Sequence, residues 1–253
     1  MKQKKFKLPF LVVNPKNYLY DSRSLRLAQE CDQVAKETGI TIFFTCPYTD
    51  IRLIKENTEN LIVTAQSMDS LVPGRGVGRV LPEAIKNAGA GAVFLNHEEN
   101  PKTVSELCKA IQRAKRLGII TLVCADSVLE SKAIAVMGPD IIIAEPSDLI
   151  GTGKLADDAY KIAACQAIKE ANPDVSPMIA AGVSTAEDCY NIVKLGSDGT
   201  GGTSGILNAP DHLTQVRAWA EAIMEAYNER MQNGVPAVEE KPAEKAPKAE
   251  KKK

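Results

Sequence analysis

Short apolar segments alternate with segments of helical periodicity along almost the whole chain, and this alternation restricts the possible folds more than any other feature. In the short segments the apolar residues are consecutive, which is typical of strands covered on both faces of a parallel sheet. Seven strands are predicted on this basis: Phe10–Asn14, Thr41–Cys46, Leu61–Gln66, Ala92–Asn96, Ile120–Ala125, Ile141–Glu145 and Met178–Gly182.

Between these strands the apolar residues recur with the spacing of an amphipathic helix. In Val104–Leu117, apolar residues gather on one side and basic residues on the other. The same spacing predicts helices at Leu25–Glu37, Pro82–Ala88, Leu129–Met137, Tyr160–Ala171 and His212–Met231. Ser184 followed by Glu187 has the spacing of a capping box, which predicts one more helix that ends at Leu195.

An eighth strand is predicted at Gly199–Ser204, although this glycine-rich segment has little β propensity. The alternation places a strand here, and glycines at a strand end can mark the close approach of a ligand to the backbone. Eight strands, each followed by a helix, predict a (β/α)8 TIM barrel of parallel strands. A doubly wound sheet competes with it, but Asn-Pro-Lys-Asn follows the first strand where a glycine-rich dinucleotide fingerprint would stand.

Composition separates the barrel, predicted at residues 1–234, from a C-terminal segment. Residues 235–253 are rich in Lys, Glu, Pro and Ala, with six lysines and four glutamates. Such a segment has too little apolar surface to offset the entropy lost on ordering. It is therefore predicted to be a disordered tail outside the functional site.

Charge and cysteine content narrow the class of partners and the compartment. The net charge of −1 gives no electrostatic reason to expect a nucleic acid or an acidic membrane as partner. Six dispersed cysteines without a Cys-x-x-Cys pair predict free thiols in a reducing compartment, and two histidines give no metal site of mixed Cys and His ligands. With no apolar run of about 18 residues to span a membrane, a cytoplasmic protein is expected.

Polar residues stand where the predicted strands end, which is the end of a barrel that carries functional residues. They are Asn14 and Lys16 after the first strand, His97 and Glu99 after the fourth, Glu145 after the sixth, Gly182–Ser184 after the seventh and Thr203–Gly205 after the eighth. Each has an ordinary structural interpretation when taken alone, such as a solvated loop lysine or a helix-start histidine. Their joint occurrence at strand ends favours a functional site.

The chemistry of this set is specific. Glu145 can take a proton from carbon, a neutral His97 can polarise the adjacent carbonyl, and Lys16 can hold negative charge. Backbone N–H groups in the turns at Gly182–Ser184 and Thr203–Gly205 can bind a phosphate. The set predicts proton abstraction beside a carbonyl in a small phosphorylated sugar.

Four motifs in order between about residues 10 and 231 carry a family resemblance. They are Asn14-Pro-Lys16, Asn96-His97-Glu-Glu99-Asn100, Glu145-Pro with Ile150-Gly-Thr-Gly153, and Ala181-Gly-Val-Ser-Thr-Ala-Glu-Asp188. Together they resemble the triosephosphate isomerase family, and the short chain is similar to its compact archaeal branch. The resemblance implies interconversion of D-glyceraldehyde 3-phosphate and dihydroxyacetone phosphate through an enediolate in glycolysis and gluconeogenesis, without a cofactor or metal. It also implies a homo-oligomer, with a tetramer favoured over a dimer.

The resemblance further implies a role for each site residue. Glu145 is the base that moves a proton between carbons, His97 the acid that moves protons between oxygens, and Glu99 supports His97. Lys16 is an electrostatic clamp with Asn14 beside it. Pro146–Gly153 is a lid that gives the Gly151 amide to the phosphate. The other backbone donors to the phosphate are Ser184, Thr203 and Ser204.

Four positions depart from the family pattern: Pro15 replaces an aromatic residue, Glu98 a serine, Val77 a threonine that reaches the partner subunit, and Thr200-Gly201-Gly202 bulky residues. Because Glu98 adds a second carboxylate beside His97, we expect it to favour a charged imidazole. Two alternatives stay open: another barrel that acts on a phosphorylated sugar, and a catalytically degenerate barrel that binds sugar phosphates or serves as an interaction scaffold.

Overall fold

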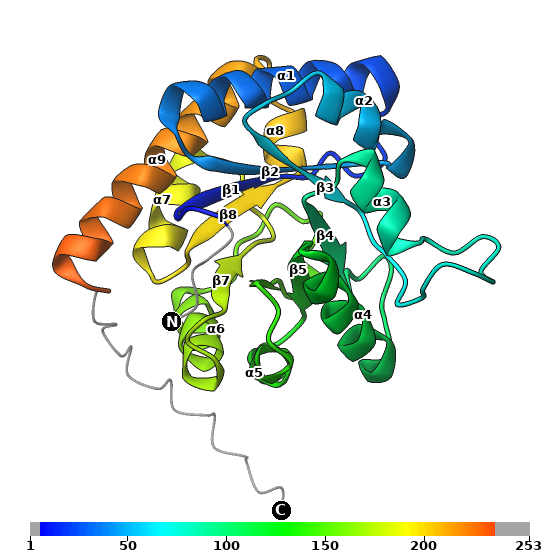
Figure 1. Ribbon diagram of the computed structural model, residues 1–253. Coiled ribbons are helices and arrows are strands. Elements are labelled where there is room, and N and C mark those ends of the chain that lie inside the picture. The colour runs from blue at the N-terminus through cyan, green and yellow to red at the C-terminus, as the bar shows by residue number, and fades with distance from the viewer. Residues whose placement is uncertain (1–5, 236–253) are drawn as a thin grey trace, which may run out of the picture.

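A computed structural model describes residues 6–235 and confirms the (β/α)8 barrel. Eight parallel strands close the barrel in sequence order, because β1 pairs with both β2 and β8, and the helices lie outside it (Figure 1). The strands are β1 (Phe10–Val13), β2 (Thr41–Cys46), β3 (Leu61–Ala65), β4 (Ala92–Leu95), β5 (Ile120–Ala125), β6 (Ile141–Ala144), β7 (Ser176–Ile179) and β8 (Gly199–Gly202). All eight predicted strands are therefore present, including the glycine-rich one.

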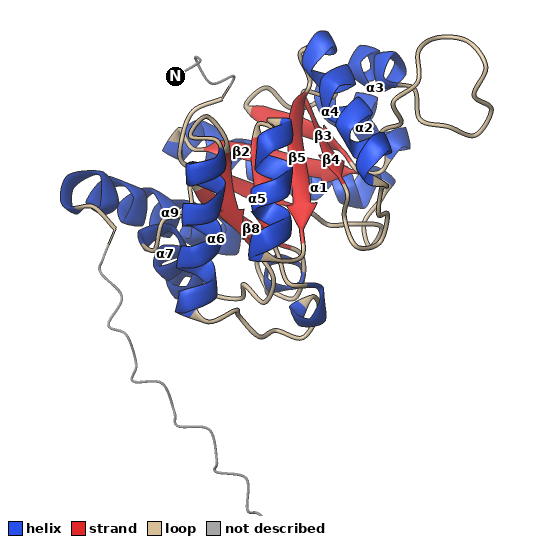
Figure 2. Ribbon diagram, turned by 90° about the horizontal axis from the view of Figure 1, so that it is seen from below, coloured by secondary structure: helices blue, strands red, loops and turns tan. Residues whose placement is uncertain are grey.

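The helices follow the predicted pattern with small shifts at their ends. They are α1 (Asp21–Thr38), α2 (Ile51–Glu56), α3 (Pro82–Ala88), α4 (Val104–Leu117), α5 (Val128–Met137), α6 (Asp158–Ala171), α7 (Ala186–Lys194), α8 (Ser204–Leu207) and α9 (His212–Asn233), with 3-10 turns at Tyr48–Asp50 and Ser147–Leu149. The short helices α2 and α8 were not among the predicted elements. Figure 2 shows the strands enclosed between helices and the long loop between β3 and α3 projecting from the body.

The predicted capping box is wrong by one residue. The side chain of Thr185 accepts a hydrogen bond from the Asp188 N–H (3.1 Å), and Asp188 Oδ2 accepts one from the Thr185 N–H (2.8 Å). Ser184 lies before this cap, where its hydroxyl donates to the Gly182 carbonyl (3.1 Å). The shorter Asp188 side chain at the third helical position closes the box, so Ser184 belongs to the turn and not to the helix.

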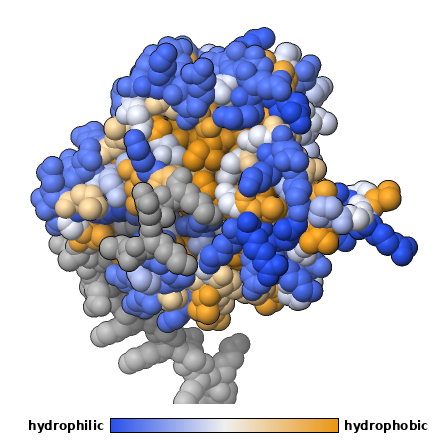
Figure 3. All heavy atoms as spheres, viewed as in Figure 1, coloured by the Kyte–Doolittle hydropathy of each residue, from blue (hydrophilic) through white to orange (hydrophobic). Residues whose placement is uncertain are grey.

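The core has two apolar layers. One fills the barrel with inward-facing residues such as Phe10, Val12 and Ile143, and the other lies between the strands and the helices. Phe6, Phe10 and Phe43 pack edge to face inside the barrel, with ring centroids 5.3 to 5.7 Å apart. The space-filling view shows the same division, with hydrophilic residues over the outer helices and apolar residues toward the middle of the visible face (Figure 3).

The glycines of β8 are explained by the neighbouring strand β1. A Cβ atom on Gly201 would lie 2.0 Å from the Val12 carbonyl oxygen, and one on Gly199 would lie 2.3 Å from that of Phe10. Both glycines pair in register with these β1 residues. The close approach expected at these glycines is therefore to the backbone of β1, and it closes the barrel.

Because of this contact, alanine should lower the free energy of unfolding by different amounts at the adjacent positions Gly201 and Gly202. Gly201→Ala should destabilise the fold by about 1–3 kcal/mol or more, since the added methyl overlaps the backbone of β1. Gly202→Ala should cost much less, because its nearest neighbour, Trp219 Cη2, would be at an ordinary 3.5 Å. Urea denaturation of both variants at equal protein concentration measures the difference. An equal loss in the two variants would contradict the account.

The cysteines and the helices bear on the predicted compartment. All six cysteines are free thiols; five of them are buried, and Cys108 is partly exposed. In residues 6–235 there is no helix with the length and apolar character needed to cross a bilayer. Apart from Val235, the tail predicted at residues 235–253 lies outside the described residues.

Candidate active site

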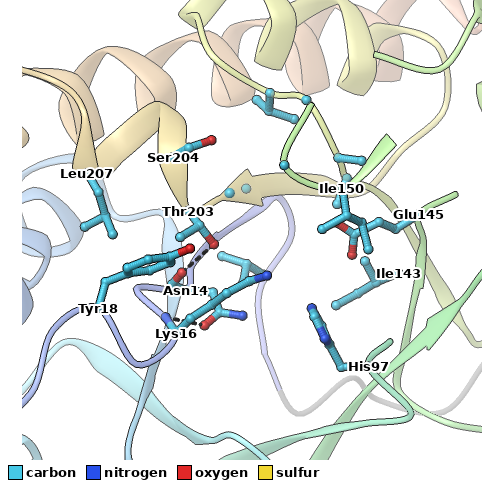
Figure 4. Close-up of a pocket in the computed structure, with 18 of the residues that line it drawn as sticks. Asn14, Lys16, Tyr18, His97, Ile143, Glu145, Ile150, Thr203, Ser204 and Leu207 are labelled. Atoms are coloured by element: carbon cyan, nitrogen blue, oxygen red, sulfur yellow. Dashed lines mark hydrogen bonds between the residues drawn. The ribbon is translucent and has the colours of Figure 1, made fainter. Parts of the chain in front are cut away.

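A cavity of about 470 Å³ opens at the carboxyl ends of the strands and brings the predicted residues together (Figure 4). Its lining includes Asn14, Lys16, His97, Glu145, Gly151, Thr203 and Ser204. Glu99 lines an adjoining cavity of about 240 Å³, which also contains Asn14, Lys16 and His97. Ser184 lies in the neighbouring turn, beside the lining residues Gly182 and Val183. Residues from β1, β4, β6 and β8 thus meet in one place.

His97 is held in the neutral tautomer that donates from Nε2. Asn96, in the left-handed region with φ 58°, turns the chain after β4, and its amide donates to the Cys124 carbonyl (3.1 Å). In the next turn, Nδ1 of His97 accepts a hydrogen bond from the Glu99 N–H (3.1 Å). An acceptor role at Nδ1 assigns the proton of the neutral ring to Nε2, which is then the donor toward substrate.

The charge state of His97 depends more on burial than on Glu98. Burial and the neighbouring Lys16 lower the pKa of His97, while Glu99 and Glu98 act in the opposite direction with smaller effect. The net shift is downward, so the ring is neutral near pH 7. Glu98 acts in the expected direction, toward a charged imidazole, but burial outweighs the added carboxylate.

Lys16 projects into the cavity from the turn after β1 (Figure 4). This residue has φ 48°, and the conformation is held by its N–H, which donates to Asn14 Oδ1 (3.0 Å), and by its carbonyl, which accepts from Gln66 Nε2 (3.0 Å). Its ammonium group contacts Glu99 Oε1 at 2.5 Å. Pro15, which lacks an N–H, is accommodated in this turn, and the Lys16 side chain still points into the cavity.

Glu145 stands at the end of β6, where its N–H donates to the Ala125 carbonyl (2.9 Å). Its carboxylate faces the cavity from β6 and His97 faces it from β4, with β5 between these strands and with Ile143 and Ile150 close by (Figure 4). Burial raises the pKa of Glu145 to about 7, with Lys16 opposing the shift and Glu98 and Glu99 adding to it. A carboxylate that titrates near neutral pH is suited to general base catalysis.

The segment Pro146–Gly153 has the features of a hinged loop. Ser147 donates its N–H to Asp126 Oδ1 (2.6 Å), which fixes the first hinge after β6. Gly151 and Gly153 have φ of 75° and 71°, and the tip between them is exposed. At the far end, a Cβ on Gly182 would lie 2.1 Å from the Lys154 carbonyl oxygen, so the loop packs closely on the turn after β7.

The two glycine-containing turns lie against each other at one side of the cavity. A Cβ on Gly205 would be 2.5 Å from the Val183 carbonyl oxygen, and the Thr203 hydroxyl donates to the Asn14 carbonyl (2.7 Å). The N–H of Ser184 donates to Asp188 Oδ2 (3.0 Å), so in this structure it takes part in the cap of α7. The turns are positioned to surround one end of a bound ligand.

Several residues near the cavity were not identified from the sequence. Tyr18, Leu207 and His212 also line it, and Asp126 anchors the loop hinge. Asp126 directly follows β5, so its strand-end position was a signal that the sequence did offer. For metal binding, residues 6–235 contain no group of three or more His, Cys, Asp and Glu side chains that could hold an ion.

Comparison with known proteins identifies the family of this chain. The family model described as triosephosphate isomerase matches residues 9–219. A triosephosphate isomerase of Methanocaldococcus jannaschii is 36% identical over 212 residues, which cover 82% of this chain and 96% of the relative. That of Sulfolobus acidocaldarius is 32% identical over 228 residues, 88% of this chain and 99% of the relative. The chain therefore belongs to the triosephosphate isomerase family, with relatives of the archaeal type along most of its length.

Proposed function

We propose that this chain interconverts D-glyceraldehyde 3-phosphate and dihydroxyacetone phosphate, with Glu145 as the base and His97 as the acid. The observation that carries the proposal is their common cavity: a carboxylate with a pKa of about 7 faces a histidine whose pKa is lowered. One group is therefore a good proton acceptor, and the other is neutral and donates through Nε2.

The proposed reaction moves two kinds of proton. Glu145 takes the proton from the carbon beside the carbonyl, and the Nε2–H of His97 donates to the carbonyl oxygen, which gives an enediol phosphate. His97 then recovers a proton from the other oxygen, and Glu145 returns its proton to the neighbouring carbon. Atoms balance without an external acid or base. Lys16 stabilises the negative charge that develops on the oxygens.

The phosphate is assigned to the backbone of Gly151, Ser184, Thr203 and Ser204, with Asn14 supporting Lys16. Glu99 has two supporting contacts, since its carboxylate pairs with Lys16 at 2.5 Å and its N–H donates to His97 Nδ1 at 3.1 Å. Closure of the loop Pro146–Gly153 over the intermediate would exclude water, which matters because an exposed enediol phosphate can eliminate phosphate.

A coupled assay on the purified protein tests the proposal, with D-glyceraldehyde 3-phosphate as substrate and reduction of dihydroxyacetone phosphate as the readout. Turnover that phosphoglycolate inhibits competitively is the expected result. Tight binding of phosphoglycolate without any isomerisation would reject the proposal and favour a degenerate sugar-phosphate-binding barrel.

The oligomeric state is part of the same proposal, and we infer a homotetramer. Two separate surfaces expose apolar side chains: the loop of residues 66–81 carries Val72 and Val77, and the outer face of α5 carries Leu129 and Val136, which are 79% and 74% exposed. A closed dimer needs one self-complementary surface, whereas a tetramer with two-fold axes uses two. Light scattering should give about four times the chain mass of 27.3 kDa, and a monomer would contradict the inference.

A cytoplasmic location is also proposed, supported by the six free thiols.

A further inference from the structure

The helix α9 contacts both phosphate-binding turns through one glutamine. Gln215 Nε2 donates to the Ser184 carbonyl (3.1 Å) in the turn after β7 and to the Gly205 carbonyl (3.0 Å) at the start of α8. An amide nitrogen carries two hydrogens, so a single side chain bridges the two turns with both of its donors. No residue of α9 was predicted to take part in phosphate binding.

One helical turn further along α9, Trp219 packs against the turn that contains Gly205. Its side chain is fully buried, and a Cβ on Gly205 would lie 2.8 Å from Trp219 Cζ2 and 2.9 Å from the Cα of Ser184. A Cβ on Gly202 would lie 3.5 Å from Trp219 Cη2. The indole therefore fills the space beside Gly202, where the family pattern has bulky residues, and touches the turn that Gln215 holds.

We propose that Gln215 and Trp219, together the α9 platform, position the two turns that bind the substrate phosphate. The hydrogen bonds fix the carbonyls of Ser184 and Gly205, one in each turn, and so limit movement of the backbone of both turns. The indole limits movement of Gly202 and Gly205 toward α9. The two turns are thus held in place before the phosphate arrives, which lowers the ordering cost of binding. This inference rests on the proposed function for the phosphate site.

A purely structural role for these residues makes different predictions from a positioning role. Ile223 is also fully buried on α9, one turn beyond Trp219, and Gln33 donates a side-chain hydrogen bond to Glu37 (2.8 Å) on the exposed face of α1. Ile223→Ala and Gln33→Met are therefore matched controls. The first removes core volume from the same helix, and the second removes a glutamine hydrogen bond on α1 while Glu37 keeps its ion pair with Arg217 of α9.

The experiment compares Gln215→Met and Trp219→Phe with the two controls and the wild type. It measures KM for D-glyceraldehyde 3-phosphate, the inhibition constant of inorganic phosphate, and the turnover of D-glyceraldehyde, which has no phosphate. Loss of two neutral hydrogen bonds in Gln215→Met should raise both the KM and the inhibition constant about tenfold. Turnover of D-glyceraldehyde should stay as in the wild type. Trp219→Phe should show the same pattern with smaller changes, and the controls should show none.

Two results would overturn the proposal. In one, KM and the phosphate inhibition constant do not change in Gln215→Met. In the other, turnover of D-glyceraldehyde falls in parallel, which indicates general damage to the barrel. A further pair of variants tests the role of the indole volume. Trp219→Leu should weaken phosphate binding, and the double variant Trp219→Leu/Gly202→Ala, which replaces part of the lost volume, should recover part of the phosphate affinity. A wild type that binds phosphate but lacks isomerase activity would reject the proposed function while leaving the α9 platform measurable by phosphate binding.

Discussion

Replacement of Glu145 by glutamine is expected to lower kcat by about 10²- to 10⁴-fold, the contribution of a positioned general base. The substitution keeps the size of the side chain and removes its ability to accept the carbon-bound proton. KM should change little, since the phosphate contacts lie elsewhere in the cavity. Glu225→Gln, an exposed position of α9, is the matched control and should retain wild-type turnover. Unchanged kcat in Glu145→Gln would reject the assignment of the base.

The same carboxylate sets the expected pH dependence. Since burial raises the pKa of Glu145 to about 7, only the enzyme above that pH carries the base in its active, ionised form. The ratio kcat/KM of the wild type should therefore rise with pH and level off above about 7. A profile that is already flat from pH 5 upward would indicate an unperturbed carboxylate or another base.

The free energy of unfolding should fall as the pH rises through the pKa of Glu145, whereas kcat/KM should rise. The folded protein binds this proton up to a pH of about 7, whereas the unfolded chain releases it near the ordinary value of 4.5. Stability is therefore fully retained below 4.5 and is lost as the pH rises through 7, by at most about 3 kcal/mol. Glu145→Gln should be more stable than the wild type at pH 8 and equal to it near pH 4. Urea denaturation at both values measures the difference, and a variant with no advantage at pH 8 would contradict it.

Local pattern was enough to predict most of the fold. The bounds predicted for α4 are those observed, because its apolar spacing ends at clear signals: Thr103 caps the first turn and Gly118 closes the last in the left-handed region. The strand β8 was predicted only because the alternation required it. Its glycines fit against the backbone of β1, a strand from the other end of the chain, and no local pattern reveals such a neighbour.

The candidate site was also visible in the sequence, since its charged groups follow strand ends. The sequence did not predict how burial and neighbouring charges together shift the pKa of each group. The charge of Glu98 is readable beside His97, but the burial of that ring and the approach of Lys16 depend on the closed barrel. Gln215 is a comparable case, because its two carbonyl partners lie on other elements and a glutamine at a helical position has no distinguishing pattern.

Lys16→Met should lower kcat/KM by about 10²- to 10³-fold, the usual loss when one preorganised group for a developing charge is removed. Methionine keeps much of the apolar stem and removes the ammonium group, so Glu99 loses its cation at 2.5 Å. The matched control is Lys36→Met on the exposed face of α1, where no loss is expected. Lys16→Arg should recover only part of the activity, because the planar guanidinium differs in shape from a compact ammonium.

The pH profile of Lys16→Met separates an electrostatic role from simple loss of substrate affinity. Lys16 lowers the pKa of both Glu145 and His97, so its removal should raise both values. The acidic limb of kcat/KM should then move to higher pH, and at pH 7 less of the base would be ionised and more of the acid would be charged. A variant that loses activity equally at every pH would show that Lys16 only binds the substrate. Movement of the limb would show that Lys16 also lowers the pKa of the base, in addition to any contact with the substrate.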